Sequence, residues 1–256
     1  MSIATDLQTI ANNVPLVYNA GYKAGKAEGG DTTEAYNQGV ADGKVLQNTE
    51  FWEVFTTARN SSGKPYVRTS YQWAFSLWRE ENFYPTKDIT PKTLYGTFQS
   101  FNEYGTPIDL KQRLIDCGVK LETQNVESAQ AAFSMAYISV LPALDLRQCK
   151  TFNGTFNDSK IETIEKIILK DDGSQEMMSN TFKTATLKNI AFEGKIGTNV
   201  TFGSCLLLTD ESVQSIIDAL LPLGEEVTRT ITFHPDISIS TEQETEIAGK
   251  GWTLVQ

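Results

Sequence analysis

Four phenylalanines in the second half of the chain recur at intervals that constrain the fold more than any other feature. The gaps between them are 23, 26 and 20 residues, and an isoleucine or leucine follows each one five residues later. The eight residues are Phe133, Phe156, Phe182, Phe202, Ile138, Ile161, Leu187 and Leu207. Repeats of about 20–29 residues with apolar ladders are typical of leucine-rich repeats, whose copies stack because one copy cannot bury its apolar face alone. The sequence therefore predicts an irregular leucine-rich-repeat solenoid over residues 108–208, with these eight side chains in its core.

The chain changes character after this region. Eight residues after the phenylalanines stand Leu141, Ile164 and Ile190, but the fourth copy has Asp210 at that position. Thr209 is a helix N-cap followed by an acidic first turn, and residues 228–233 alternate like a strand. A second short helix is predicted after Ser240 and a last strand over residues 252–255. We therefore predict a mixed α/β fold in which residues 209–256 form a C-terminal cap that closes the stack.

The N-terminal segment contains a repeat on helical spacing. Residues 18–26 and 36–44 both fit Y-N-x-G-x-x-x-G-K, and their offset of 18 residues equals five helical turns. In a continuous helix one face would carry Tyr18, Gly21, Gly25, Tyr36, Gly39 and Gly43. Glycines four residues apart allow a second helix to approach closely, so residues 1–48 are predicted to anchor the chain in a homo-oligomer such as a trimer. The alternative is a flexible tether, because residues 28–31 interrupt the pattern with two glycines.

The region between these parts is rich in aromatic residues. Residues 51–104 hold 14 of the 26 aromatic side chains. We interpret residues 49–107 as an N-terminal cap of the solenoid, with most of these rings in its core. The other interpretation is a stacking surface for a partner, for which Trp73, Trp78 and Tyr84 are the candidates.

The composition argues against several classes of function. A net charge of −10 disfavours nucleic acids and anionic membrane surfaces. The chain has one histidine, His234, which we expect at the surface or in the cap, and three cysteines without a C-x-x-C pair. We therefore predict no catalytic residue, cofactor or metal ligand, and we interpret the cysteines as small buried hydrophobes. Residues 205–256 carry nine acidic and two basic residues, a formal charge of −7 that indicates a solvated cap.

The chain shows no sign of membrane insertion or export. No apolar run approaches the roughly 18 residues of a membrane span, and the opening residues lack the basic and apolar regions of a signal peptide. We expect synthesis in a cytoplasm.

Three stretches resemble a known family. The Phe-x-x-Cys-x-x-Leu unit over residues 202–208 and the Phe and Ile ladders resemble bacterial surface-antigen (BspA-like) leucine-rich repeats. The closing segment, with L-T-D-E-S-V-Q-S-I-I-D-A-L, T-I-T-F and T-E-Q-E-T-E-I-A-G-K-G-W-T-L, resembles the end unit of repeat proteins of gut Firmicutes and their tailed phages. The opening M-S-I-A-T-D-L-Q-T-I-A-N-N-V-P-L-V-Y-N-A-G resembles the start of proteins encoded by those phages and prophages. The resemblance implies a non-enzymatic adhesion or virion-attached protein.

Three hypotheses about function follow. The first is a virion protein, part of a tail fibre or baseplate, with residues 1–48 bound to other virion proteins and the repeats facing a bacterial surface glycan or protein. The second is a bacterial adhesin or interaction scaffold, in the cytoplasm or on the cell surface, built from the same repeats. The third is a carboxylate-based hydrolase, which needs only two acidic residues and leaves no motif.

Overall fold

The computed structural model describes residues 88–101 and 106–256, and their fold is mixed α/β. The strands are β1 (Ile108–Asp109), β2 (Ile138–Leu141), β3 (Leu144–Asp145), β4 (Thr163–Ile168), β5 (Asn189–Glu193), β6 (Val200–Phe202), β7 (Arg229–Phe233) and β8 (Trp252–Val255). The helices are α4 (Leu110–Asp116), α5 (Asp210–Ala219) and α6 (Thr241–Gly249). Within the described ranges every strand pair is parallel, and the strands form a five-stranded and a three-stranded sheet.

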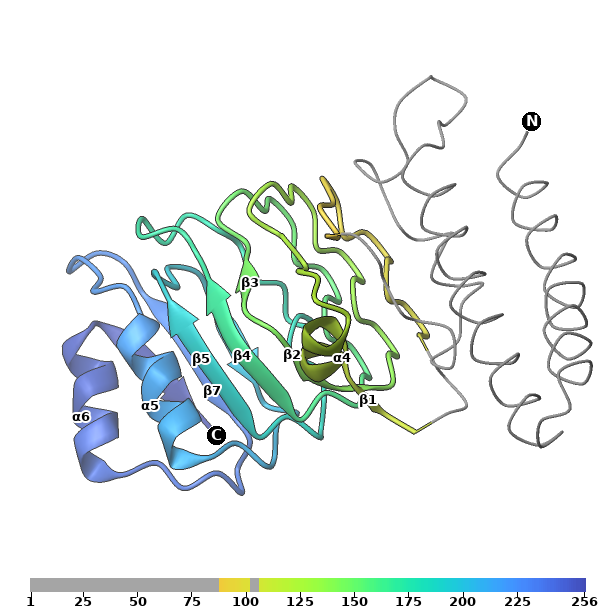
Figure 1. Cartoon of the computed structure of the whole chain (residues 1–256). Helices are drawn as coiled ribbons and strands as arrows, with labels where there is room; N and C mark the ends of the chain where they lie inside the picture. Colours follow the sequence, from red (N-terminus) through yellow and green to blue (C-terminus); the bar gives the residue numbers. More distant parts are fainter. Residues whose placement is uncertain (1–87, 102–105) are drawn as a thin grey trace, which may run out of the picture.

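Successive turns of the chain, which we call tiers, lie on one another (Figure 1). The first tier is residues 88–101, the second 108–137, the third 138–160, the fourth 161–187 and the fifth 188–208. Strand β1 of the second tier pairs with β2 of the third, and β2 and β3 both pair with β4 of the fourth. Strand β4 pairs in turn with β5 of the fifth tier. The second to fifth tiers thus each contribute at least one short strand to the same curled parallel sheet, and the first tier joins the second through a bridge between Ile89 and Leu121.

A stack of phenylalanine rings runs through the core, and Phe192 of β5 packs edge-on against two of its rings. The four predicted rings stack in order, with centroid distances of 5.7, 5.5 and 4.6 Å. The stack extends at both ends, to Phe98, which is 5.1 Å from Phe133, and to Phe233, which is 6.0 Å from Phe202. The spacing pattern hid these two rings because α4 and α5 are inserted in the intervals that precede and follow the regular copies.

Seven of the eight predicted core residues are buried, and the prediction for Leu207 is wrong. The Leu207 side chain is 44% exposed, whereas Leu208 is 7% exposed and Cys205 is fully buried. The fifth tier is shorter than the three tiers before it, and Leu206 and Leu207 form a turn just before the α5 N-cap at Thr209. The turn directs both leucines to solvent, so the inward position moves one residue on, to Leu208.

The segments that carry the rings have an unusual backbone. Ala131 and Met135, two residues before and after Phe133, have φ angles of 51° and 54°. The amides of Ala131, Phe133 and Met135 donate to carbonyls of the third tier at 2.8 Å, while the amides between them bond within their own segment. Alternate amides therefore join the tiers without forming regular strands, which satisfies the backbone groups that burial removes from water.

The C-terminal unit has the elements predicted from the sequence. Thr209 caps α5, Ser240 caps α6 with a capping box, and β7 and β8 fall at the predicted strands. Helix α5 lies beside β5 and covers its edge, because the Oγ atoms of Ser212 and Ser215 accept hydrogen bonds of 2.9 Å from the β5 amides of Ile190 and Phe192. Serine hydroxyls thus replace the next strand of the sheet, which protects the edge from pairing with another chain.

Candidate functional site between the second and third tiers

The predicted anchoring and aromatic binding residues cannot be located in this structure. Residues 1–48, which include the six repeat positions from Tyr18 to Gly43, lie outside the described part of the chain, and so do Trp73, Trp78 and Tyr84. Among the described aromatic residues of this region, Phe98 and Phe101 are buried, as a core role requires, whereas Tyr95 is 44% exposed. The remaining assignments in this region stay predictions.

The second and third tiers are joined at both ends and separate between them. At one end Ile108 pairs with Ile138, and at the other the Lys150 amide donates to the Glu127 carbonyl at 2.9 Å. Helix α4 is inserted directly after β1, and within the described ranges β3 pairs only with β4. The edge of β3 that faces the second tier is therefore not paired with a strand.

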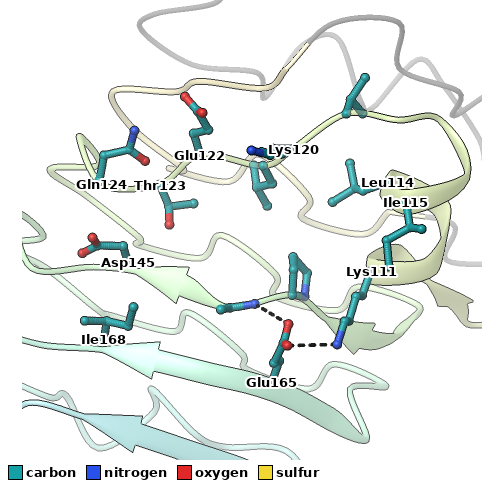
Figure 2. A pocket seen from close by; sticks show the side chains of 14 residues that line it. Lys111, Leu114, Ile115, Lys120, Glu122, Thr123, Gln124, Asp145, Glu165 and Ile168 are labelled. Carbon is teal, nitrogen blue, oxygen red and sulfur yellow. Dashed lines mark hydrogen bonds and ion pairs between the residues drawn. The ribbon is translucent and has the colours of Figure 1, made fainter.

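An open pocket of about 380 Å³ lies in this separation, which we call the cleft. Its walls come from α4, from residues 119–124 of the second tier and from residues 142–145 of the third tier (Figure 2). The apolar lining includes Leu114, Val119, Leu121, Pro142 and Ile168. The polar lining includes Lys111, Lys120, Glu122, Thr123, Asp145 and Glu165. A concave site with apolar walls and a few polar groups is the usual form of a binding site.

Some charged side chains of the cleft are paired with a neighbouring charge, and others are not. Glu165 is held at the α4 end, by the Lys111 ammonium at 3.0 Å and by the Ala143 amide, which donates to it at 3.2 Å (Figure 2). The Arg147 guanidinium, whose Nε lies 3.0 Å from Asp145, holds the pKa of that carboxyl below its ordinary value. Lys120 and Glu122 form no ion pair with any described residue. These two charges are thus available to a partner.

Thr123 is the one lining residue with an unsatisfied buried group. Its side chain is 2% exposed, and its Oγ1 has no hydrogen-bond partner among the described residues. In Figure 2 the hydroxyl points across the cleft toward β3. A buried hydroxyl without a partner costs about 1–3 kcal/mol, so a ligand that supplied one would recover this free energy. Thr123 stands ten residues before Phe133, just as the buried Leu146 stands ten residues before Phe156. A threonine at the position of a buried leucine was therefore the feature of the sequence that could have indicated this site.

The other chemically reactive side chains lie outside the cleft. His234 follows β7 and accepts a hydrogen bond of 3.1 Å from the Asp236 amide, in the surface turn expected for it. Burial raises the pKa of Cys149 to about 11 and that of Cys205 to about 12, so both thiols stay protonated at neutral pH. No group of three His, Cys, Asp or Glu side chains able to hold a metal ion occurs in residues 88–101 and 106–256.

The arrangement in the cleft suits recognition. Among residues 88–101 and 106–256, no base lies within hydrogen-bond distance of the Thr123 hydroxyl to make it a nucleophile. No protein-family model, curated protein or solved structure matches the chain. Among the described helices, none is long and apolar enough to cross a bilayer.

Proposed function

We propose that the chain acts by binding rather than by catalysis, as a leucine-rich-repeat-like attachment protein of a phage particle. The observation that carries this proposal is the cleft, an opening with walls from the second and third tiers. A continuous apolar core holds the two walls, so the groups around the cleft are positioned before a partner arrives, which lowers the cost of binding.

The assignment to a phage particle is supported by the sequence. The opening and closing segments resemble proteins encoded by tailed phages of gut Firmicutes, and the glycine repeat in residues 1–48 is typical of helices that pack closely. In this proposal residues 1–48 assemble as an oligomer and bind other virion proteins. The tiers then face the bacterium and contact a protein or glycan of its surface.

Two measurements test the proposal. Mass spectrometry of purified particles of the encoding phage should find the chain, and fluorescently labelled full-length chain should bind host cells in a saturable manner. Absence from the particles would contradict the assignment to a virion and favour the bacterial adhesin or interaction scaffold. Absence of saturable cell binding would contradict the attachment role.

The anchoring role has its own test. Deletion of residues 1–48 should abolish both the oligomeric state measured by light scattering and the association with particles. A truncated chain that keeps both properties would show that the anchor lies elsewhere.

A further inference from the structure

We propose that the cleft accepts an extended peptide segment of a partner protein as an added β-strand, with alternating apolar and polar side chains. The inference names the class of partner for the cleft, so it rests on the proposed binding function, although not on the phage particle. Three features of the cleft support it: the direction of the backbone groups on its two walls, the unsatisfied hydroxyl of Thr123 and the unpaired charges.

The second-tier wall presents backbone groups to the cleft. The Ile89 amide donates to the Lys120 carbonyl at 2.7 Å, and the Glu122 amide donates to the Ile89 carbonyl at 2.8 Å. Lys120 and Glu122 therefore use their backbone groups toward the first tier. Because these groups alternate in direction along a parallel strand, the amide and carbonyl of Leu121 and the amide of Thr123 face the cleft, whereas the Thr123 carbonyl accepts a hydrogen bond of 2.9 Å from the Val126 amide.

The third-tier wall presents its own backbone groups in return. The Leu146 amide donates to the Ile168 carbonyl of the fourth tier at 2.9 Å. By the same alternation, the backbone groups of Asp145 face the cleft, and the Ala143 amide reaches the Glu165 side chain instead of a strand. The bridge residue Leu121 on one wall and the edge of β3 on the other thus face each other, and an extended peptide between them could pair with both. Addition of a strand to an open sheet edge is a common mode of peptide recognition.

The side chains of the walls define the chemistry of the peptide. Leu121 and Thr123 are buried, whereas Lys120 and Glu122 are turned outward, as alternation along a strand requires. An inward peptide residue beside Leu121 should be apolar, and the one beside Thr123 should carry a hydroxyl or amide. An outward acidic residue would face Lys120, and an outward basic residue would lie between Glu122 and Asp145.

The same pairing of opposite charges already joins neighbouring tiers elsewhere. The Lys188 ammonium lies 2.7 Å from the Glu162 carboxylate, and the Lys166 ammonium lies 3.0 Å from the Glu193 carboxylate. Each pair joins the fourth tier to the fifth. A sugar ligand is disfavoured because no aromatic side chain lines the cleft to stack on a sugar ring. A strand that repeats the charge pattern of the protein's own tiers is the occupant that matches these walls.

A synthetic hexapeptide tests the proposal on the full-length chain. In the parallel orientation of the tiers, Ac-Val-Glu-Val-Lys-Thr-Val-NH2 places Glu beside Lys120, Lys beside Glu122 and Thr beside Thr123. Titration calorimetry should show binding of one peptide per chain, and amide hydrogen exchange should slow at Leu121, Thr123 and Asp145. The charge-exchanged peptide Ac-Val-Lys-Val-Glu-Thr-Val-NH2 should bind about tenfold more weakly, because two cross-strand pairs become repulsive.

Two matched variants separate a role in binding from a role in stability. Thr123→Val should weaken binding of the first peptide by about fivefold to tenfold, because the hydrogen bond to the ligand is lost. Thr97→Val is the control, since Thr97 is equally buried and its hydroxyl is also unsatisfied, but it lies in the first tier and does not line the cleft. This variant should leave the affinity unchanged.

Three results would overturn the proposal: binding of neither peptide, equal loss of affinity in both variants, or exchange protection at β8 instead of the cleft. The proposed attachment role is tested separately, by the binding of labelled chain to host cells. Labelled chain that binds cells while neither peptide binds would leave attachment intact and remove the peptide proposal. Peptide binding without cell binding would do the reverse.

Discussion

The interface between the second and third tiers and the one between the third and fourth tiers are built from the same chain pattern but close differently. The third and fourth tiers pair along both β2 and β3, with Leu144 opposite Ile167 and Asp145 opposite Ile168. The second and third tiers pair at β1 and again near Glu127, with the cleft between. A stack of tiers can therefore hold a binding site without losing its core, provided that the layers rejoin on both sides of the opening.

Two inserted helices show why one interface opens and another does not. Helix α5 lies beside β5 and places two serine hydroxyls on the strand's amides. Helix α4 is shorter, seven residues, and Lys111 joins it to Glu165 of β4 by an ion pair. The inserted helix that covers a strand edge in this fold, α5, does so with side chains that replace the hydrogen bonds of the next strand.

The largest expected difference concerns apolar side chains of the two interfaces. Ile167→Ala, in the closed interface, should lower the free energy of unfolding by about 2–5 kcal/mol, because it leaves a cavity in a packed layer. Leu121→Ala, in the cleft wall, should cost about half as much, because part of its surroundings is already open to water. Urea unfolding of the two full-length variants would measure both values. Equal losses would show that the cleft is packed as tightly as its neighbour.

Removal of the Thr155 hydroxyl and removal of the Thr123 hydroxyl should change the free energy of unfolding in opposite directions. Thr155 is fully buried in the third tier, and its Oγ1 donates to the Phe152 carbonyl at 2.8 Å. Thr155→Val should therefore lower stability by about 1 kcal/mol, whereas Thr123→Val should raise it by up to about 1 kcal/mol, because an unsatisfied hydroxyl is removed. Thermal unfolding would measure the two shifts. Destabilisation by Thr123→Val would mean that the hydroxyl has a partner in solution.

The smallest expected effect depends on pH at the edge of the cleft. Arg147 holds the pKa of Asp145 below its ordinary value of 3.8, so the folded state favours the charged carboxylate. Its contribution to stability is complete above about pH 4 and disappears as the pH falls through the lower folded pKa. Arg147→Gln should therefore reduce stability more at pH 7 than at pH 2, because the Asp145 carboxyl is more protonated at the lower pH. The loss at pH 7 should be small, because the Arg147 side chain is 56% exposed. A variant with the same loss at both values would contradict the assignment to this ion pair.

The spacing of apolar residues predicted much of the stack but not its opening. Phe133, Phe156, Phe182 and Phe202 were identified because their spacing is regular, whereas Phe98 and Phe233 were missed because helices lengthen the flanking intervals. The C-terminal elements were predicted because their caps and alternation are local signals.

The cleft has weaker signals. Asp109 accepts a hydrogen bond of 2.7 Å from the Gln112 amide and so marks the start of α4, and Thr123 replaces a leucine of the ladder. Each is a single residue in a short segment. Which strand edges stay unpaired depends on how the tiers meet in space, and periodicity along the chain carries no information about that.

Amide hydrogen exchange of the full-length chain without ligand tests the central claim most directly. The claim is that the second and third tiers separate at the cleft while the third and fourth tiers are paired. The amides of Leu121, Thr123 and Asp145 should exchange at least about a hundredfold faster than those of Leu146 and Leu169, which donate across paired tiers. Equal protection of the two groups would show that the cleft is closed in solution, and would contradict the account of this site.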